Sequence, residues 1–421
     1  MPRYHIWTIG CQMNKADSEH IAAYLEQVGY VPAPRPAAAD IVLLNSCVVR
    51  QSAEDKVVHK LESLRSREGG RVLALTGCMV DSDIDSLQKR FPHVDLFFKP
   101  QDLSALASFL EDRGLVSGRV DPGSVVARPN TSAFVNIIQG CDNFCSYCIV
   151  PYRRGREHSR PMDEVVGEVE GLAQSGTREV ILLGQNVDSY GHDLNADTSL
   201  AGLLQRLNPV GGLNRIRFLT SHPKDMSDEL IETMARLDKV CEHVSLPAQA
   251  GDDGILEAMG RGYTAGQYVG LAERIRRTVP HVALSTDVIV GFPGESGEQF
   301  DRTYELLREL RFDTVHVACY SPRTGTIAYR RLADDVSDAE KVRRRKLVEE
   351  LQEGIATEIN EKLMGQRVEV LVEGRKKGKW WGRTRTDKLV FFEGSADCKG
   401  QLVNVEITYT SPWSLQGIPV V

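Results

Sequence analysis

The 421-residue sequence lacks the marks of a membrane or secreted protein. No segment approaches the roughly 18 uninterrupted apolar residues of a membrane span, and the opening MPRYHIWTIGCQMNKADSEH lacks the basic-then-apolar order of a secretory signal. Nine cysteines are too few and too scattered for a disulfide framework, and an odd number cannot all pair. We therefore expect a cytoplasmic protein whose cysteines serve metal or redox chemistry.

A large excess of basic residues is also missing. The 51 Lys and Arg against 58 Asp and Glu give a net charge of -7, which argues against wholesale wrapping of nucleic acid. A net charge of -7 still allows a basic patch on one part of the surface. The length corresponds to about three domains, and we expect boundaries that give residues 1–128, 129–358 and 359–421.

The first of these domains alternates short apolar runs with helical patterns. The runs cover residues 4–9, 41–44 and 72–75, and the helical patterns cover 21–28 and 55–66. This rhythm predicts a doubly wound parallel α/β sheet. Residues 114–130, rich in Gly, Pro and Ser and without a clear period, read as a linker.

The second domain contains six further apolar runs separated by segments of helix length. They lie at 134–138, 180–183, 216–219, 244–246, 288–290 and 315–318. Repeated strand and helix units predict a full or partial barrel whose active site lies at the strand ends. Apolar residues at Val342, Leu347, Leu351, Ile355 and Ile359 predict one long surface helix over 337–362 that closes the barrel. Short alternating runs at 367–371, 389–392 and 402–407 then predict a small all-β barrel.

The strongest local motif is a C-x3-C-x2-C spacing at the end of the first barrel strand. Cys141, Cys145 and Cys148 supply three thiolates within eight residues. An iron–sulfur cube held by three thiolates keeps one iron open for a substrate or cofactor. Zinc in a closed structural site would need a fourth ligand, which His158 offers as an alternative.

A second set of cysteines emerges from the predicted sheet of the first domain. Cys11, Cys47 and Cys78 each follow a predicted strand by two to three residues, in the phrases TIGCQMN, LNSCVVR and LTGCMVD. Parallel strands end at one edge of a sheet, so the three predict a second metal site. Three other cysteines have no such partners and are expected to be packing residues; these are Cys241, Cys319 and Cys398.

Basic and aromatic residues gather in the last domain. Residues 361–421 hold ten Lys and Arg against seven Asp and Glu, and the cations surround two tryptophans. The candidates for binding a phosphate backbone and unstacked bases are Lys379, Trp380, Trp381, Arg383 and Arg385. The alternative is a solvated hairpin with one tryptophan packed inward.

Four arginines follow the barrel cysteines directly: Arg153, Arg154, Arg156 and Arg160. They either border an anionic substrate or pair with acids on the following helix.

With these residues in view, the sequence resembles the radical S-adenosylmethionine (SAM) methylthiotransferases over essentially its whole length, and among them the MiaB type that modifies transfer RNA. The resemblance rests on GCQMN, on GCDNFCSYCIVPYRRGREHSRP, LLGQNVDSYG, TSHP and YSPRTGT, and on a carboxyl-terminal TRAM domain. It implies a partial (β/α)6 radical SAM barrel between an N-terminal methylthiotransferase domain and the TRAM barrel.

The resemblance also implies roles for the cysteines. Cys141, Cys145 and Cys148 would hold the 4Fe–4S cluster that reduces SAM to a 5'-deoxyadenosyl radical, and Cys11, Cys47 and Cys78 an auxiliary 4Fe–4S cluster for sulfur delivery. One SAM would supply the methyl group and another the radical. The implied cofactor contacts are Tyr147, Gln185, Gln249, Val288 and Gly291.

The implied reaction adds sulfur and a methyl group at C2 of an N6-isopentenyl-adenosine next to the anticodon, with the TRAM domain holding the anticodon arm. Alternatives are the same chemistry on threonylcarbamoyl-adenosine in tRNA or on a ribosomal-protein aspartate, and a non-catalytic, zinc-containing RNA-binding protein. Expected partners are an electron donor such as flavodoxin or ferredoxin and a sulfur carrier, with the enzyme itself a monomer.

Overall fold

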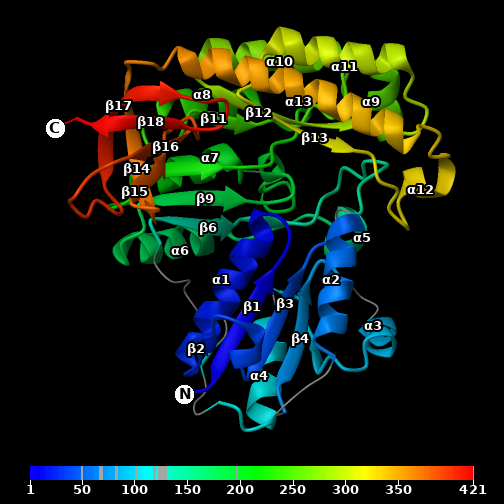
Figure 1. The fold of residues 1–421 in the computed structure, drawn as a ribbon, viewed down its shortest axis with the longest axis vertical. Coiled ribbons are helices and arrows are strands. Elements are labelled where there is room, and N and C mark those ends of the chain that lie inside the picture. Colours follow the sequence, from blue (N-terminus) through cyan, green and yellow to red (C-terminus); the bar gives the residue numbers. More distant parts are fainter. Residues whose placement is uncertain are drawn as a thin grey trace. The chain divides into compact units, whose positions relative to one another are not determined.

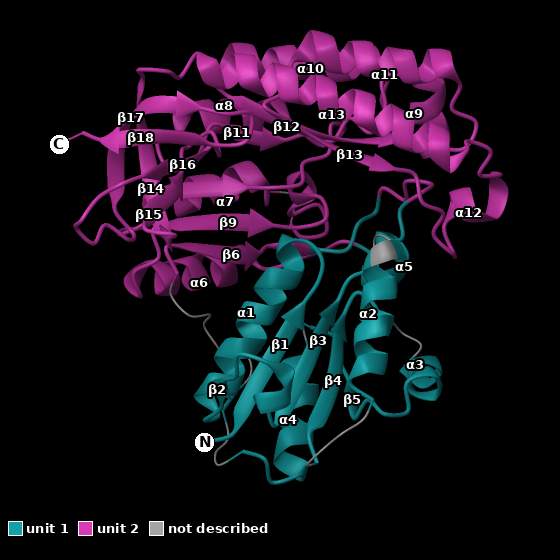
Figure 2. Ribbon diagram, in the orientation of Figure 1, with its two compact units in different colours: residues 1–128, 139–142, 148–156 teal, residues 129–138, 143–147, 157–421 magenta. Residues whose placement is uncertain are grey.

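The structure, a computed structural model, describes residues 1–48, 51–65, 70–80, 84–100, 102–116, 120–121, 130–195 and 197–420. The chain forms two compact units (Figure 2). Unit 1 comprises residues 1–128, 139–142 and 148–156, and unit 2 comprises 129–138, 143–147 and 157–421. Most of the expected linker falls outside the described residues.

Unit 1 is built on a five-stranded, wholly parallel sheet (Figure 1). The spatial order is β2-β1-β3-β4-β5. The strands are β1 (Arg3–Thr8), β2 (Val31–Pro32), β3 (Ile41–Ser46), β4 (Val72–Gly77) and β5 (Leu96–Phe97). The helices are α1 (Gln12–Gln27), α2 (Gln51–Ser63), α3 (Ile84–Arg90), α4 (Leu103–Asp112), the short α5 (Val150–Arg154) and the 3-10 turn η1 (Pro36–Ala38).

Both faces of this sheet are covered. Alternate residues of β3 point to opposite faces: Ile41 and Leu43 pack in the cluster that includes α1 and α4, and Val42 and Leu44 in the cluster that includes α2. The predicted doubly wound sheet is therefore confirmed. The apolar pattern of the sequence did not predict β2, β5, α3 and α4. The two strands are only two residues long, so they carry little periodicity.

Unit 2 contains six parallel strands of an open barrel in sequence order. They are β6 (Ser132–Asn136), β9 (Glu179–Leu183), β10 (Arg215–Phe218), β11 (His243–Ser245), β12 (Ala283–Val290) and β13 (Thr314–Cys319). A bridge between Ile216 and Val240 connects the two three-stranded sheets. The predicted partial (β/α)6 barrel is confirmed. Two short strands flank the cysteine loop, β7 (Ile138–Gln139) and β8 (His158–Ser159).

Helices cover the outside of the barrel (Figure 1). They are α6 (Met162–Gln174), α7 (Leu200–Leu207), α8 (Asp228–Arg236), α9 (Asp253–Met259), α10 (Ala265–Thr278), α11 (Gly297–Leu310) and α13 (Asp338–Glu361). The short α12 (Ile327–Arg331) and the 3-10 turn η3 (Val187–Ser189) lie in the segments that follow β13 and β9. Side-chain caps begin many of them, and Thr264 with Gln267 and Ser296 with Gln299 form full capping boxes.

The predicted long helix exists as α13, but its expected apolar stripe is partly wrong. Val342 is 38% exposed, whereas the polar Lys341, Arg344 and Gln352 are buried. Lys341 pairs with Asp334, and Arg344 with Glu295, so these cations are neutralised where they are buried. An apolar period cannot reveal a helix face that packs through ion pairs.

The chain ends in a closed five-stranded barrel of order β14-β15-β16-β18-β17. Its strands are β14 (Arg367–Lys376), β15 (Lys379–Arg383), β16 (Leu389–Phe392), β17 (Leu402–Thr410) and β18 (Leu415–Pro419). The small all-β barrel is confirmed, although the sequence reading missed β15 and β18. Within the described part of the chain, no helix combines the length and apolarity that crossing a bilayer requires.

Candidate functional site

The three amino-terminal cysteines lie at one edge of the sheet of unit 1. Cys47 and Cys78 directly follow β3 and β4, and Cys11 follows β1 by three residues. Because β1, β3 and β4 are parallel neighbours, their carboxyl ends meet there. The predicted placement of the three loops at a common edge is therefore what the structure shows.

Close backbone packing brings these loops together. The N–H of Cys78 donates to the carbonyl oxygen of Ser46 at 2.9 Å. A Cβ on Gly10, which has φ +136°, would lie 2.9 Å from the Cβ of Cys47, and one on Gly77 only 2.3 Å from the oxygen of Ser46. Any larger residue at either glycine would push the cysteine loops apart.

An amide network beneath the loops was missed by the sequence reading. The fully buried Asn14, from the GCQMN phrase, donates from Nδ2 to Oδ1 of Asn45 at 2.8 Å and to the carbonyl of Ser46 at 2.8 Å. Asn45 in turn donates to Ser18 Oγ at 2.9 Å. The signal was present in the sequence, because Asn45 lies near the end of an otherwise apolar, buried strand and must find buried partners.

Arg154 of α5 reaches the same edge within unit 1. Its Nε lies 3.2 Å from the sulfur of Cys78, and its Nη2 lies 3.6 Å from Oδ2 of Asp17. Burial raises the pKa of Cys78 above the ordinary thiol value, although Arg154 acts in the opposite direction. A pocket of about 200 Å³ opens here, lined by Cys78, Lys99, Tyr152, Arg153 and Arg154 among others.

The barrel cysteines lie in a loop whose residues divide between the units. Cys141 and Cys148 belong to unit 1, and Cys145 belongs to unit 2. In unit 1 the N–H of Cys141 donates to the oxygen of Gly155 at 3.2 Å. A Cβ on Gly140, at φ +79°, would lie 2.0 Å from the oxygen of Arg156, so the turn before Cys141 requires glycine.

In unit 2, the part of this loop around Cys145 is anchored to α9 and α12. Ser146 donates its N–H to the oxygen of Met259 at 2.8 Å, and its own carbonyl accepts from the N–H of Ala328 at 2.7 Å. The buried Arg261 points Nη1 at the sulfur of Cys145, 3.4 Å away. Phe144 has φ +46°, an uncommon conformation for a residue with a side chain.

The expected cofactor contacts lie in the cysteine loop and near the ends of β9, β11 and β12. Gln249 and Val288 form a parallel bridge, and Gln249 adopts φ +69°. Gly291 follows β12, and its N–H donates to Oε2 of Glu295 at 2.5 Å. Tyr147 packs against the buried cluster that contains Phe292. Gln185 is half-buried just beyond β9. The structure thus brings Gln249 and Val288 into contact, and their binding of a cofactor stays a prediction.

A buried polar network at the ends of β9 and β10 was also missed. Burial lowers the pKa of His222 to about 2, assisted by Arg261 and Lys224, so its ring is neutral. Its Nδ1 accepts the N–H of Lys224 at 3.2 Å, which places the proton on Nε2. Asp188 accepts from Ser221 Oγ at 2.9 Å, yet burial raises the pKa of Asp188 to about 7.

Backbone strain accompanies this network. Thr220 has φ +73°, which costs a β-branched residue on the order of 1–3 kcal/mol. Strained residues that persist in folded proteins concentrate at functional sites. The positive φ angles of Thr220, Phe144 and Gln249 therefore support the strand-end loops as the candidate functional site of the barrel.

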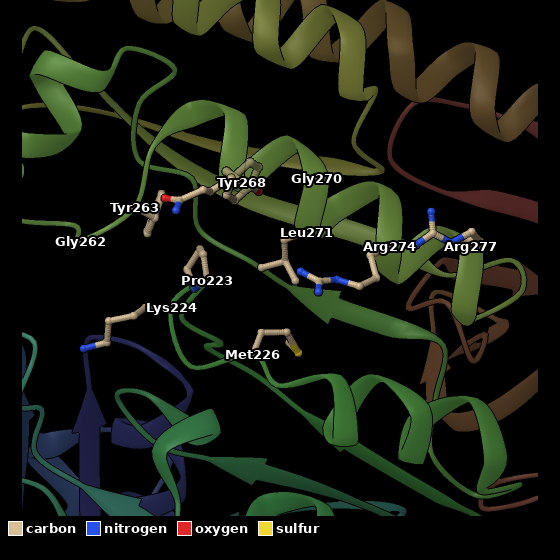
Figure 3. A pocket seen from close by; sticks show the side chains of 11 residues that line it. Pro223, Lys224, Met226, Gly262, Tyr263, Tyr268, Gly270, Leu271, Arg274 and Arg277 are labelled. Carbon is tan, nitrogen blue, oxygen red and sulfur yellow. The ribbon is translucent and has the colours of Figure 1, made fainter.

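A groove of about 620 Å³ lies beside this edge, between the segment 223–226 and α10 (Figure 3). Tyr263, Leu271 and Met226 contribute apolar surface, and Arg274 and Arg277 contribute charge. Arg274 is paired with Asp228 at 2.9 Å. Lys224, also on the groove, donates to Oδ1 of Asn143 in the cysteine loop at 2.8 Å.

The basic segment of the small barrel differs from the prediction at two residues. Trp380 is only 6% exposed, packs in the barrel core and donates from Nε1 to the oxygen of Gly394 at 3.2 Å. It therefore offers no face to a base. Arg385 forms a two-pronged ion pair with Glu242 at 2.7 Å and donates to the oxygen of Val240, which ties the small barrel to the large one.

The other three predicted residues stay accessible. Lys379, Trp381 and Arg383 are half-buried, and Lys379 donates to Oε1 of Gln416 at 2.8 Å. Two large aromatic side chains that the sequence reading passed over are far more exposed: Tyr409 at 53% and Trp413 at 60%. Tyr409 comes just after an irregularity in the pairing of β17 with β18, and Trp413 lies in the loop between these strands, so an alternating pattern does not predict that either is exposed.

The remaining predicted residues have structural surroundings. His158, the alternative zinc ligand, lies with Nδ1 3.5 Å from Oδ2 of Asp193. Arg160 pairs with Glu168 of the following helix at 2.6 Å, and Arg156 pairs with Asp142 at 2.7 Å. Cys241 is fully buried; Cys319 and Cys398 pack against hydrophobic clusters, as expected of packing residues.

Both cysteine sets have the donor chemistry of iron–sulfur sites. Each offers three cysteine thiols in loops, without a fourth cysteine nearby in sequence. Among the described residues, no three His, Cys, Asp or Glu side chains already stand in a metal-binding arrangement. The structure therefore brings the cysteine-bearing loops into place, and ligation by the six thiolates stays a prediction.

Three family models match successive parts of the chain. The model described as Radical SAM superfamily matches residues 135–307, the one described as Uncharacterized protein family UPF0004 matches 3–99, and the TRAM domain model matches 361–420. Together they cover both cysteine sets and the small barrel.

Curated relatives resemble the chain along nearly its full length. A protein from Dehalococcoides mccartyi is 51% identical over 99% of this chain and 98% of its own length, and one from Herpetosiphon aurantiacus is 47% identical over 99% and 97%. A relative from a Thermoanaerobacter species is 43% identical over 98% and 92%. All three are named tRNA-2-methylthio-N(6)-dimethylallyladenosine synthase.

Solved structures resemble the chain in fold alone. The radical SAM methyltransferase TsrM from Kitasatospora setae, with cobalamin and a [4Fe-4S] cluster bound, gives a TM-score of 0.53 at 15% identity, over 90% of this chain and 81% of that one. The cobalamin-dependent radical SAM enzyme OxsB gives 0.51 at 10% identity, over 83% and 56%.

Proposed function

This chain belongs to the family of tRNA-2-methylthio-N(6)-dimethylallyladenosine synthases and is a radical SAM methylthiotransferase that modifies tRNA, and on this premise we propose how its residues divide the reaction. The cofactors are SAM and two 4Fe–4S clusters. The product is the 2-methylthio derivative of an N6-isopentenyl-adenosine, which we place next to the anticodon.

Cys141, Cys145 and Cys148 hold the cluster that leaves one iron for SAM. With both bound, this site supplies the hydrogen-abstracting chemistry that an unactivated aromatic C–H requires and that no side chain generates alone. The chain's own part is to fix the loop: Gly140 allows the tight turn, and Ser146 anchors the loop to α9 and α12.

Cys11, Cys47 and Cys78 hold the second cluster, which serves sulfur delivery. The observation that carries this assignment is that all three cysteines lie at the same edge of the sheet, just after the carboxyl ends of β1, β3 and β4. Cysteines that serve only packing would not be expected to follow the ends of three neighbouring strands at such similar distances along the chain. The loops after β3 and β4 are joined by a backbone hydrogen bond, from the N–H of Cys78 to the oxygen of Ser46, which does not involve the thiols.

The strand-end residues of the barrel bind SAM. Gln249 and Val288 form a backbone bridge, and Gln249 has a strained backbone with φ +69°. Exposed backbone at this position would allow a flat nucleoside to approach closely. Gly291 turns the chain at the end of β12, where a Cβ would lie 2.3 Å from Cγ of Lys341. Tyr147 and Gln185 complete this set from the neighbouring loops.

The small barrel binds the anticodon arm through a revised set of residues. Tyr409 pairs in register with Gln416, and Gln416 accepts a hydrogen bond from Lys379. Exposed aromatic rings beside a cation suit unstacked bases and phosphate. We assign this face to Lys379, Trp381, Arg383, Tyr409 and Trp413, and leave out Trp380 and Arg385.

The proposal also covers the partners, the location and the oligomeric state of the enzyme. Reduction of the clusters requires an electron donor such as flavodoxin or ferredoxin, and a sulfur carrier renews the inserted sulfur. We place the enzyme in the cytoplasm, where its tRNA substrate resides, and assign it as a monomer.

A substrate comparison tests the proposed function. Anaerobically reconstituted enzyme, SAM and a reductant are incubated with one of three substrates: tRNA bearing N6-isopentenyl-adenosine, tRNA bearing threonylcarbamoyl-adenosine, or ribosomal protein. We expect methylthio product from the first alone. Product from either of the others in its place would overturn the substrate assignment.

A further inference from the structure

Each set of cysteines is accompanied by one buried arginine that aims an N–H at a cysteine sulfur. Arg154 lies 3.2 Å from Cys78 through Nε, and Arg261 lies 3.4 Å from Cys145 through Nη1. The two contacts are independent, since the first is made within unit 1 and the second within unit 2.

Among the residues that the structure describes, no carboxylate forms an ion pair with Arg261. Its described partners are the hydroxyl of Tyr263 at 2.9 Å, the oxygen of Pro247 at 3.0 Å and the sulfur of Cys145. The residue is only 5% exposed. A guanidinium buried among neutral acceptors is costly unless an anion neutralises it. Nη1 of Arg261 points at the sulfur of Cys145, so a cluster bound there would place its negative charge beside this guanidinium.

Arg154 has one carboxylate, but the geometry favours the sulfur. Its side chain is 6% exposed, and the 3.6 Å separation from Asp17 is too long for a hydrogen bond. Nε, by contrast, points at Cys78, and Nη1 lies 3.8 Å from the sulfur of Met13. Asp17 therefore offsets part of the charge of Arg154 through Nη2, and Nε remains directed at the sulfur of Cys78.

A cubic cluster bound by three thiolates carries net negative charge, and its reduction adds another electron. Net charge and hydrogen bonds to the sulfurs are the levers by which a protein sets the potential of such a cluster. A nearby buried cation stabilises the reduced form more than the oxidised form, because the attraction grows with the negative charge.

We propose that Arg154 and Arg261 are positioning residues, each of which raises the reduction potential of the cluster held by its own three cysteines. The inference rests on the proposed ligand sets. It deepens them by assigning one arginine to each cluster. Arg154 acts on the amino-terminal cluster, where Asp17 opposes it, and Arg261 acts on the barrel cluster, where the described residues include no carboxylate paired with it.

Redox titration followed by electron paramagnetic resonance tests this on the full-length chain. A background with Cys141, Cys145 and Cys148 changed to Ala isolates the amino-terminal cluster. In that background we expect Arg154→Met to shift the midpoint to more negative potential, Arg154→Lys to shift it less, and Asp17→Asn to shift it to more positive potential. Arg113→Met, which removes an exposed charge of the same unit, is the matched control and leaves the midpoint in place.

The barrel cluster is isolated by changing Cys11, Cys47 and Cys78 to Ala. There Arg261→Met is expected to lower the midpoint, and Arg261→Lys to restore most of it. Equal midpoints in wild type and the Met variants, or an Asp17→Asn shift in the negative direction, would overturn the inference. If a Met variant loads no cluster, the Asp17→Asn and Lys variants decide the outcome.

Failure of the inference is distinguishable from failure of the proposed function. If either background loses no iron relative to wild type, the ligand sets themselves are wrong. If each background keeps one cluster and the arginine variants leave its potential unchanged, the ligand sets stand and the role of the arginines is rejected.

Discussion

The backbone N–H of Cys78 donates to the carbonyl oxygen of Ser46 at 2.9 Å, which ties the loop after β4 to the loop after β3. Because Cys47 directly follows Ser46, this one bond sets two predicted ligands side by side in the fold. The amino-terminal cysteine site therefore depends on the sheet itself.

Metal content should divide between the two cysteine sets. Wild-type protein purified anaerobically should contain about eight irons and eight sulfides per chain. Replacing Cys11, Cys47 and Cys78 together by Ala should remove about half of both, and so should replacing the barrel set. Cys398→Ala, a half-buried cysteine of the small barrel, is the control and should keep the full content. Zinc without sulfide in the wild type would instead support a structural metal site.

Two aromatic substitutions in the small barrel should have opposite consequences. Trp413→Ala should weaken tRNA binding by about 5- to 150-fold, since base stacking contributes about 1–3 kcal/mol, and should leave the melting temperature nearly unchanged. Trp380→Ala should instead destabilise the fold by about 3–5 kcal/mol, because it removes a core side chain. Filter binding and thermal denaturation measure the two effects, with Leu402→Ala as the surface control.

Arg385 should behave as a structural tether. Its ion pair with Glu242 and its bond to the oxygen of Val240 lie between the two barrels of unit 2, so Arg385→Met should cost about 1–3 kcal/mol of stability. The affinity for tRNA and its salt dependence should stay as in wild type. A reduced salt slope in this variant would show that Arg385 contacts phosphate after all.

Glu373 should make the stability of the protein depend on pH. Burial raises the pKa of Glu373 to about 7, with Glu179 and Asp387 acting in the same direction and Arg383 and Arg217 against it. The folded state then holds a proton that the unfolded state releases near pH 4.5, so this contribution is complete below that pH. It is lost as the pH rises through 7.

Denaturant unfolding at pH 5, 7 and 9 measures this effect. Glu373→Gln keeps the neutral form at every pH, so it should match the wild type at pH 5 and be more stable at pH 9. A wild-type advantage at pH 9 would contradict the assigned sign.

Much of the fold was predictable because the strands carry regular apolar runs. The strands β1, β3 and β4 were predicted close to their observed ends, and this was enough to place Cys11, Cys47 and Cys78 at one edge. Spacing alone located the barrel cysteines. In both cases the positions of the cysteines along the chain were enough to predict a metal site.

What escaped prediction depends on contacts between distant residues. Lys341 and Arg344 look like solvent-facing cations until Asp334 and Glu295 are found opposite them. Trp380 and Trp381 are neighbours with opposite orientations, and only the pairing of β15 within the closed barrel shows which one is buried. Arg154 and Arg261 are likewise ordinary cations in the sequence, and their cysteine partners lie 76 and 116 positions away.

The most direct test of the central claim is nucleoside analysis of tRNA from cells with and without this gene. Total tRNA is digested, and the 2-methylthio derivative of N6-isopentenyl-adenosine is quantified by mass spectrometry. We predict that deletion removes the methylthio nucleoside and accumulates its N6-isopentenyl precursor, and that the wild-type gene restores it while the Cys141→Ala gene does not. An unchanged level of the methylthio nucleoside in the deletion strain would contradict the account.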